Sequence, residues 1–111
     1  SKIPVYTQSK QYHGVLMGRG SGRMLSLAYV PINAQVKKGD PLFTSGLGGV
    51  YPAGYPVAEV IWVRRDVRKP FLSIKARSYA SAYRHFYVFF LTPARFKKPK
   101  SSFNNTVSSI R

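Results

Sequence analysis

The sequence contains no cysteine, and this absence excludes three kinds of site. A disulfide framework, a thiolate metal site and a cysteine nucleophile all require that residue. Acidic residues are nearly as scarce, because Asp40, Glu59 and Asp66 are the only carboxylate side chains in 111 residues. General acid–base chemistry needs paired carboxylates, or a histidine beside one, and these three acids are dispersed along the chain. The composition therefore argues against an enzyme.

Long apolar runs are also missing. The longest, at residues 86–91, is far shorter than the ~20 residues that a membrane-spanning helix needs. The opening SKIPVYTQ has neither an initiating Met nor the apolar stretch of a signal peptide. We therefore expect the sequence to be a fragment of a longer chain.

Positive charge dominates what is present. Eighteen Lys and Arg face three acids, so the formal net charge is +15 and the surface should attract polyanions or acidic protein faces. The basic residues gather in two clusters, one at residues 64–69 and one at residues 97–100. With eight Tyr and seven Phe in the chain, a basic small barrel that binds nucleic acid is the alternative to a docking function. Against this alternative, the aromatic residues do not alternate with the basic ones in any single strand.

Short strands separated by Gly and Pro account for most of the chain. Period-two alternation, or enrichment in β-branched and aromatic residues, predicts strands at residues 3–7, 12–17, 24–30, 41–44, 56–64, 71–77 and 86–91. Turn signals every ~8–12 residues favour a small six- to seven-stranded β-barrel, because closure removes the sheet edges that promote aggregation. The predicted fold class is therefore all-β. Residues 78–85 fit either a helical turn or a strand edge.

The chain is expected to divide into a β-barrel domain at residues 1–92 and a basic tail at residues 93–111. The tail has few large apolar residues and contains two prolines, so we expect it to be extended or partly disordered on its own.

Alternation also assigns side chains to faces of the predicted strands. The even-numbered residues of 71–77 should point inward, because they are the apolar ones. In the same way Leu25, Leu27 and Tyr29 should share one face of their strand, and Trp62 should share a face with Val60.

The glycine-rich stretches are better explained as turns than as active-site loops. GRGSG at residues 18–22 is followed by a strand pattern and not by a helix whose N-terminus could hold a phosphate. We interpret it as a hairpin turn, with anion contact by Arg19 and Arg23 as the alternative. Ser45 lacks the G-x-S-x-G elbow and any adjacent base. His13 and His85 are too few for a metal site of three or four ligands.

The stretch from residue 39 to residue 57 has a long and specific spacing, GD-(x)3-TSG-LGG-(x)2-P-x-G-x-PV. It resembles the signature of the bacterial rod-shape-determining MreC family. Four further motifs occur in the order expected of that family: IPV at 3–5, GVLMG at 14–18 and LSLAYV at 25–30 before this stretch, and FLSIK at 71–75 after it. The resemblance covers roughly residues 3–91. Two positions depart from it, since Ala58 stands where the family often has Gly and Tyr51 where Phe is common.

This resemblance implies the C-terminal β-barrel of an MreC-like protein, separated from its membrane anchor and coiled coil. It implies a non-enzymatic scaffold of cell-wall elongation, at the periplasmic face of the bacterial inner membrane, in which only the missing N-terminal anchor meets the membrane. The implied partners are the transpeptidase penicillin-binding protein 2 and, through other parts of the full-length protein, MreD and the actin-like MreB. Self-association is implied as well. We expect no cofactor, no metal and no nucleic acid partner.

Partner-binding residues are predicted here from side-chain type alone. We expect exposed aromatic anchors on or near the 39–60 stretch and the last strand, namely Tyr51, Tyr55, Tyr87 and Phe89. We expect a basic cluster to tune the association rate and orientation more than the affinity, namely Arg64, Arg65 and Arg68. No catalytic residue is predicted.

Overall fold

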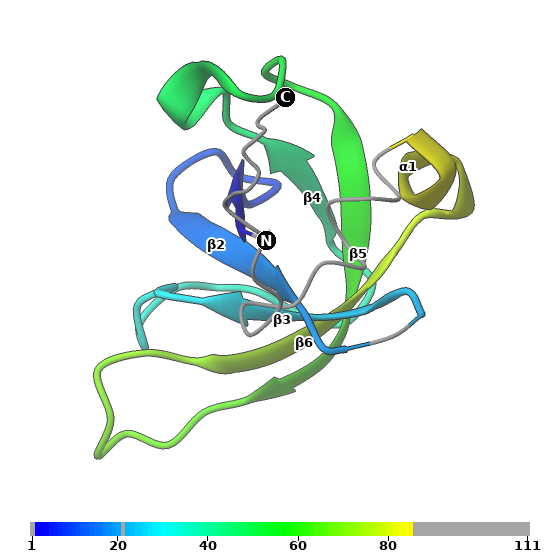
Figure 1. The fold of residues 1–111 in the computed structure, drawn as a ribbon. Coiled ribbons are helices and arrows are strands. Elements are labelled where there is room, and N and C mark those ends of the chain that lie inside the picture. Colours follow the sequence, from blue (N-terminus) through cyan, green and yellow to red (C-terminus); the bar gives the residue numbers. More distant parts are fainter. Residues whose placement is uncertain (1, 21, 86–111) are drawn as a thin grey trace, which may run out of the picture.

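The computed structural model describes residues 2–20 and 22–85, which form a closed β-barrel with one short α-helix (Figure 1). The strands are β1 (Lys2–Tyr6), β2 (His13–Gly18), β3 (Met24–Ala28), β4 (Pro41–Thr44), β5 (Pro56–Arg64) and β6 (Ser73–Ser78). All pairings are antiparallel, and the order around the barrel is β1-β2-β3-β6-β5-β4. The predicted all-β barrel is confirmed. The predicted strand at 86–91 and the tail at 93–111 lie outside the described residues.

Strict alternation builds the core of the barrel. Ile3 and Val5 of β1 are fully buried, whereas the residues on either side of them are not. Leu72, just before β6, and Ile74 and Ala76 within it are buried as predicted, because inward and outward side chains alternate along this segment. The barrel interior is therefore filled by aliphatic side chains of modest size.

Two side chains lie on the face opposite to the predicted one. Tyr29 has a φ of 74°, so the chain leaves the β3 pattern there, and Tyr29 is exposed while Val30 is buried. A β-bulge between Val60 and Trp62 reverses the alternation of β5, because an extra residue changes which side chains oppose the partner strand. Val60 remains buried, but Trp62 lies opposite Lys75 and points outward. The predictions that placed Tyr29 and Trp62 with core residues are wrong for these reasons.

The chain turns into α1 (Ala80–His85) directly after β6, which settles the alternatives for residues 78–85. Ala82 of α1 is buried, and the Tyr83 N–H donates a hydrogen bond to the Tyr79 carbonyl at 2.8 Å. The helix lies beside β5 on the outside of the barrel (Figure 1). Within residues 2–20 and 22–85, no helix is long and apolar enough to cross a membrane.

The barrel closes at a short seam between β1 and β4. Two residue pairs are in register there, Val5 with Thr44 and Tyr6 with Phe43. Val5 and Thr44 face the interior, and the rings of Tyr6 and Phe43 stack on the outside with centroids 5.5 Å apart. This is the shortest strand pairing of the barrel, so closure needs support from neighbouring segments.

Thr44 supplies that support by holding the 45–55 connection against the seam. Its buried hydroxyl donates to the Pro52 carbonyl at 2.5 Å and accepts the Tyr55 N–H at 2.9 Å. Its backbone N–H donates to the Tyr55 carbonyl at 2.9 Å, and its carbonyl accepts the Gly54 N–H at 2.7 Å. The 45–55 stretch is therefore a barrel connection, as its glycines and prolines indicated.

Within this connection, Gly46 and Ser45 have turn functions. Gly46 has a φ of 80°, and a Cβ at this position would lie 3.0 Å from the Ala53 Cβ, so both conformation and space favour glycine. The Ser45 hydroxyl accepts the Leu47 N–H at 3.2 Å at the start of the short 3-10 helix η1 (Leu47–Gly49). Ser45 thus acts as a turn residue.

Replacing Thr44 with Val tests the contribution of its hydroxyl. We expect Thr44→Val to lower the free energy of unfolding by about 2–3 kcal/mol, because the Pro52 carbonyl and the Tyr55 N–H both lose a partner. Urea denaturation followed by circular dichroism measures the change. Thr44→Ser keeps the hydroxyl and should lose only about 1 kcal/mol for the missing methyl group. Equal losses in the two variants would contradict this role of the hydroxyl.

Candidate functional site

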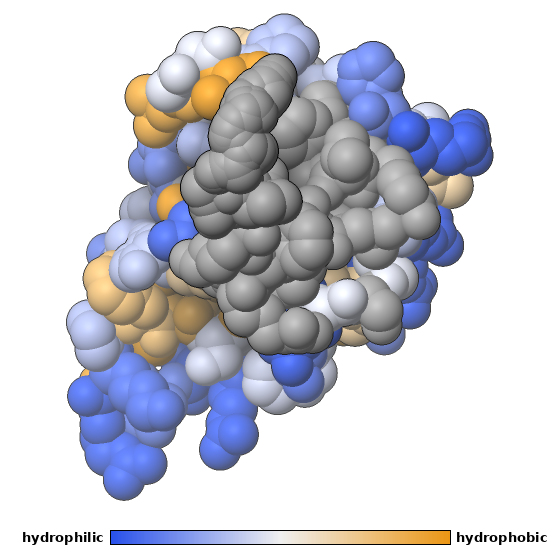
Figure 2. Space-filling view, viewed as in Figure 1, coloured by the Kyte–Doolittle hydropathy of each residue, from blue (hydrophilic) through white to orange (hydrophobic). Residues whose placement is uncertain are grey.

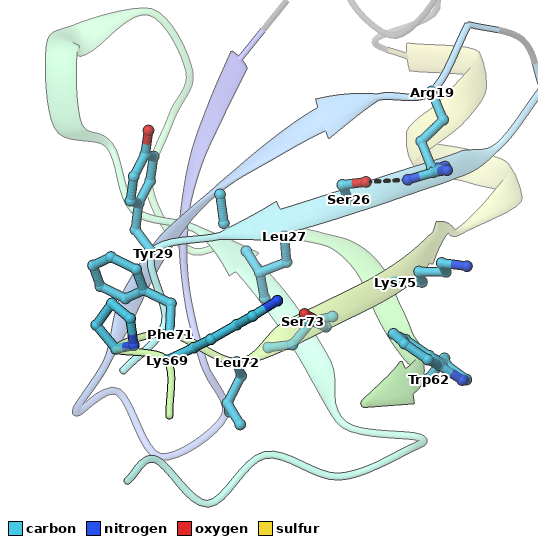
Figure 3. Close-up of a pocket in the computed structure, with 13 residues that line it drawn as sticks. Arg19, Ser26, Leu27, Tyr29, Trp62, Lys69, Phe71, Leu72, Ser73 and Lys75 are labelled. Atoms are coloured by element: carbon cyan, nitrogen blue, oxygen red, sulfur yellow. Dashed lines mark hydrogen bonds between the residues drawn. The ribbon is translucent and has the colours of Figure 1, made fainter. Parts of the chain in front are cut away.

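A groove of about 460 Å³ crosses the outer face of β3, β6 and β5, and we call it the β3–β6 groove (Figure 3). Its floor carries the small outward side chains Ser26 and Ala28 of β3 and Ser73 of β6. Because larger side chains stand around these small ones, the surface of the sheet is hollowed. The groove opens to solvent along the barrel wall.

Aromatic side chains stand at both ends of the β3–β6 groove. Tyr29 and Phe71 pack edge to face at one end, with ring centroids 5.6 Å apart, and Trp62 stands at the other end (Figure 3). They are 61%, 43% and 40% exposed, respectively. Exposed aromatic residues that flank a groove make it a candidate interaction site. Figure 2 shows one face on which hydrophobic surface, at the left edge, borders the hydrophilic surface of the β5–β6 hairpin.

Three cations line the β3–β6 groove. The Arg19 Nη1 donates to the Ser26 hydroxyl at 2.6 Å, and the Lys75 Nζ lies 4.8 Å from the centroid of the Trp62 ring. Lys69 lines the same end as the edge-to-face aromatic pair (Figure 3). No acidic residue of the described chain lines the groove. The charged side chains that line it are therefore all basic.

The acidic residues are placed elsewhere. Asp40 accepts the Lys37 backbone N–H at 3.0 Å, and its carboxylate lies 3.7 Å from the Lys37 Nζ. Asp66 accepts hydrogen bonds from the Arg68 guanidinium at 3.0 Å, and these bonds hold the pKa of Asp66 below its usual range. Each of these two acids thus already has a basic partner close to it in sequence, and neither neutralises the groove.

The predicted basic cluster lies together at the end of β5 and in the hairpin that follows. Arg65 donates to the carbonyl of Ile32 and, at 3.1 Å, to the carbonyl of Ala34, so it ties the hairpin to the 31–34 loop. Arg68 is held by its ion pair with the neighbouring carboxylate. Arg64 is exposed at the end of β5. Two of the three arginines therefore have structural contacts, and a contribution of all three to partner binding stays a prediction.

The predicted aromatic anchors are placed differently from one another. Tyr51 is 7% exposed and belongs to the core, so the expectation of an exposed Tyr51 is wrong. The reason is that the connection after β4 folds back and buries this side chain. Tyr55 is half-buried, and its ring stacks on His85 at 5.7 Å. Tyr87 and Phe89 lie outside the described residues, so their role as contacts stays a prediction.

The residues of the β3–β6 groove escaped the sequence-based prediction for identifiable reasons. Alternation groups Tyr29 with Leu25 and Leu27, and Trp62 with Val60, because it reveals neither the positive φ nor the β-bulge that turns these side chains outward. Lys75 and Ser73 were correctly placed on the outer face, but which strand would lie beside them was unknown. The one available signal was that Trp62 is the only tryptophan of the chain.

The remaining candidate groups are held in structural contacts. The described residues of GRGSG that follow Gly18 lie in the turn between β2 and β3, as predicted, and the Arg23 Nη1 donates to the Ser78 carbonyl at 3.3 Å. His13 is exposed and packs edge-on against Tyr6. Across the part of the chain that the structure describes, no three His, Cys, Asp or Glu residues are grouped as a metal site would require.

Known proteins resemble this chain in sequence and structure. The family model described as rod shape-determining protein MreC, barrel core, matches residues 1–92. The cell shape-determining protein MreC of Escherichia coli (strain K12) is 36% identical over 89 residues, which cover 80% of this chain and 24% of that protein. The protein of the same name from Haemophilus influenzae is 41% identical over 92 residues, covering 83% of this chain and 26% of that protein.

Among solved structures, the crystal structure of MreC from Pseudomonas aeruginosa superposes with a TM-score of 0.66 at 40% identity. The match covers 69% of this chain and 50% of that one. The chain thus spans about a quarter of the length of the sequence relatives that it matches.

The burial of Tyr51 predicts a loss of stability in alkali. Desolvation raises the pKa of its phenol above the usual value of about 10, so the folded state holds this proton more tightly than the unfolded state. The stabilisation is present below pH ~10 and is lost as the pH rises through the higher folded pKa. The free energy of unfolding, measured in urea between about pH 8 and pH 11, should therefore fall.

Tyr51→Phe should flatten part of this decline. Burial also raises the pKa of Tyr79, so a smaller decline should remain in that variant. An identical pH slope in Tyr51→Phe and the parent chain would contradict the assignment to Tyr51.

Proposed function

The chain belongs to the MreC family of rod shape-determining proteins, and we propose that it helps to determine bacterial cell shape as a non-enzymatic docking module. The observation that carries this proposal is the match to the barrel core over residues 1–92, which includes every element of the described barrel. This chain matches only about a quarter of the length of its relatives. The role of the full-length protein is therefore part of the proposal.

The β3–β6 groove supports docking as the physical basis of that role. Its aromatic ends and its floor of small side chains offer apolar area that a partner can bury, and buried aromatic residues are typical anchors of interfaces. The strands beneath it belong to a closed barrel, so the backbone of this surface loses little conformational freedom when a partner binds. Tyr51, which the sequence predicted as an exposed anchor, is buried. We therefore propose this groove as the docking surface.

We propose penicillin-binding protein 2, the elongation transpeptidase, as the partner, with docking at the periplasmic face of the inner membrane. Contacts with MreD and MreB, and self-association, are assigned to the full-length protein. Docking would act on the transpeptidase by a population shift, because a partner that binds one conformation better stabilises it by the difference in affinity. The proposed mechanism therefore requires no catalytic group on this chain.

Substitution at the aromatic end of the groove tests the proposal. We expect the double variant Tyr29→Ser with Phe71→Ser to weaken binding to the periplasmic region of penicillin-binding protein 2 by about 10–100-fold, because it removes two anchors. Biolayer interferometry at moderate salt measures the affinity. Val67→Ser is the matched control, since Val67 is 83% exposed but does not line the groove.

Two results would contradict the docking proposal. One is an equal loss of affinity in the control variant. The other is tight binding of a single-stranded oligonucleotide that falls steeply with salt, which would favour the nucleic-acid alternative.

In cells, a full-length protein that carries the double substitution should fail to restore rod shape, whereas one with the control substitution should restore it.

A further inference from the structure

We infer that the β3–β6 groove binds an acidic segment of a protein partner. Carboxylates of this segment pair with the three cations of the groove, and an apolar side chain lies on its floor between the aromatic ends. The inference rests on the proposed docking function and adds the chemistry of what docks. It is carried by the charge, the spacing and the fixed side chains of the groove.

Charge selects an acidic occupant. Arg19, Lys69 and Lys75 line the groove, while Asp40 and Asp66 have basic partners elsewhere. A second copy of this chain would bring another +15 to the contact, so like-charge repulsion opposes pairing of two copies through this groove. Carboxylates are the groups that complement this arrangement, since a guanidinium binds a carboxylate through two parallel hydrogen bonds.

Two of the three cations, Arg19 and Lys75, are already held by neighbouring side chains. The Ser26 hydroxyl holds the Arg19 guanidinium at 2.6 Å, and the ring of Trp62 lies 4.8 Å below the Lys75 ammonium. A side chain that is already held loses less conformational freedom on binding than an extended solvated one. These contacts therefore favour association with an acidic group at this end of the groove.

The dimensions fit a short peptide segment. The floor extends along β3 from Ser26 to Ala28, which is roughly 7 Å at the usual rise per strand residue. The Lys69 side chain begins beside Phe71 and extends toward the middle of the groove, and Arg19 and Lys75 lie at the other end (Figure 3). A segment with acidic residues on both sides of an apolar one can thus pair one carboxylate with Lys69 and the other with Arg19 or Lys75, while the apolar side chain lies on the small residues of the floor.

The arrangement of the rings favours a protein segment over nucleic acid. Single-stranded nucleic acid binds by stacking its bases on open aromatic faces. Here the Lys75 ammonium occupies a face of the Trp62 ring, and Tyr29 packs edge-on against Phe71 with an interplanar angle of 88°. An aliphatic side chain needs no parallel ring face, so it suits these rings better than a base does.

The tryptophan of the groove provides a direct readout, because Trp62 is the only one in the chain. The probe is a short synthetic peptide rich in Glu and Leu, titrated into the whole chain while tryptophan emission is recorded. The comparison probes are the same peptide with Gln in place of Glu and a single-stranded oligonucleotide of equal charge. We expect a saturable change in emission with the acidic peptide and at least about tenfold weaker binding of the Gln peptide.

Charge-reversal variants locate the binding. We expect Lys75→Glu to weaken binding of the acidic peptide at least about tenfold, and Lys69→Glu, on the opposite end of the groove, to weaken it similarly. Lys38→Glu is the control, since it makes the same change in net charge on an exposed lysine that does not line the groove. It should change the affinity by less than about threefold. Thermal denaturation of each variant verifies that it is folded.

Three outcomes would overturn the inference: an equal loss of affinity in Lys38→Glu, peptide binding without a change in Trp62 emission, or tighter binding of the oligonucleotide than of the peptide.

The result remains separable from the partner proposal. If the acidic peptide binds as expected while penicillin-binding protein 2 does not, the identity of the partner is wrong and the groove chemistry stands. If penicillin-binding protein 2 binds equally well to the parent chain and to Lys75→Glu, the groove chemistry is wrong and the docking proposal stands.

Discussion

The hydroxyl of Thr44 joins the shortest strand pairing of the barrel to the connection that folds back beside it. It bonds to the Pro52 carbonyl and to the Tyr55 N–H, and the residue that carries it also closes β4 onto β1. Closure matters because an open sheet of this size would expose unpaired edges, and because closed strands hold their curvature. The outer wall on which the β3–β6 groove lies is part of this closed sheet, so its shape depends on the seam on the other side of the barrel.

Two irregularities of the strands create the groove. A regular β5 would direct Trp62 into the barrel, and a regular end of β3 would direct Tyr29 there. The interior of a small barrel is filled by side chains such as Leu16 and Leu25, and it has no space for two more aromatic rings. The bulge and the positive φ turn both rings outward, where they flank small residues. The features that disturb the sheet are thus the ones that supply its candidate binding surface.

The distribution of charge underlies the selectivity that we infer for this surface. The few carboxylates of the chain include two that are held by nearby basic residues, and the cations of the groove lack an acidic neighbour in its lining. A groove of this composition offers apolar burial for affinity and positive charge for the orientation and rate of encounter. This combination suits the docking function that we propose.

The sequence by itself determined the family, the barrel and much of the strand pattern. The spacing of glycines and prolines between Gly39 and Val57 identified the family, and alternation placed Ile74 and Ala76 in the core, because turns and face assignment are local properties. Only the tertiary structure decided which side chains form the candidate site. The burial of Tyr51 depends on how the connection after β4 packs, and the exposure of Trp62 depends on a bulge opposite β6. Contacts between distant segments set both, and alternation along one strand carries no information about them.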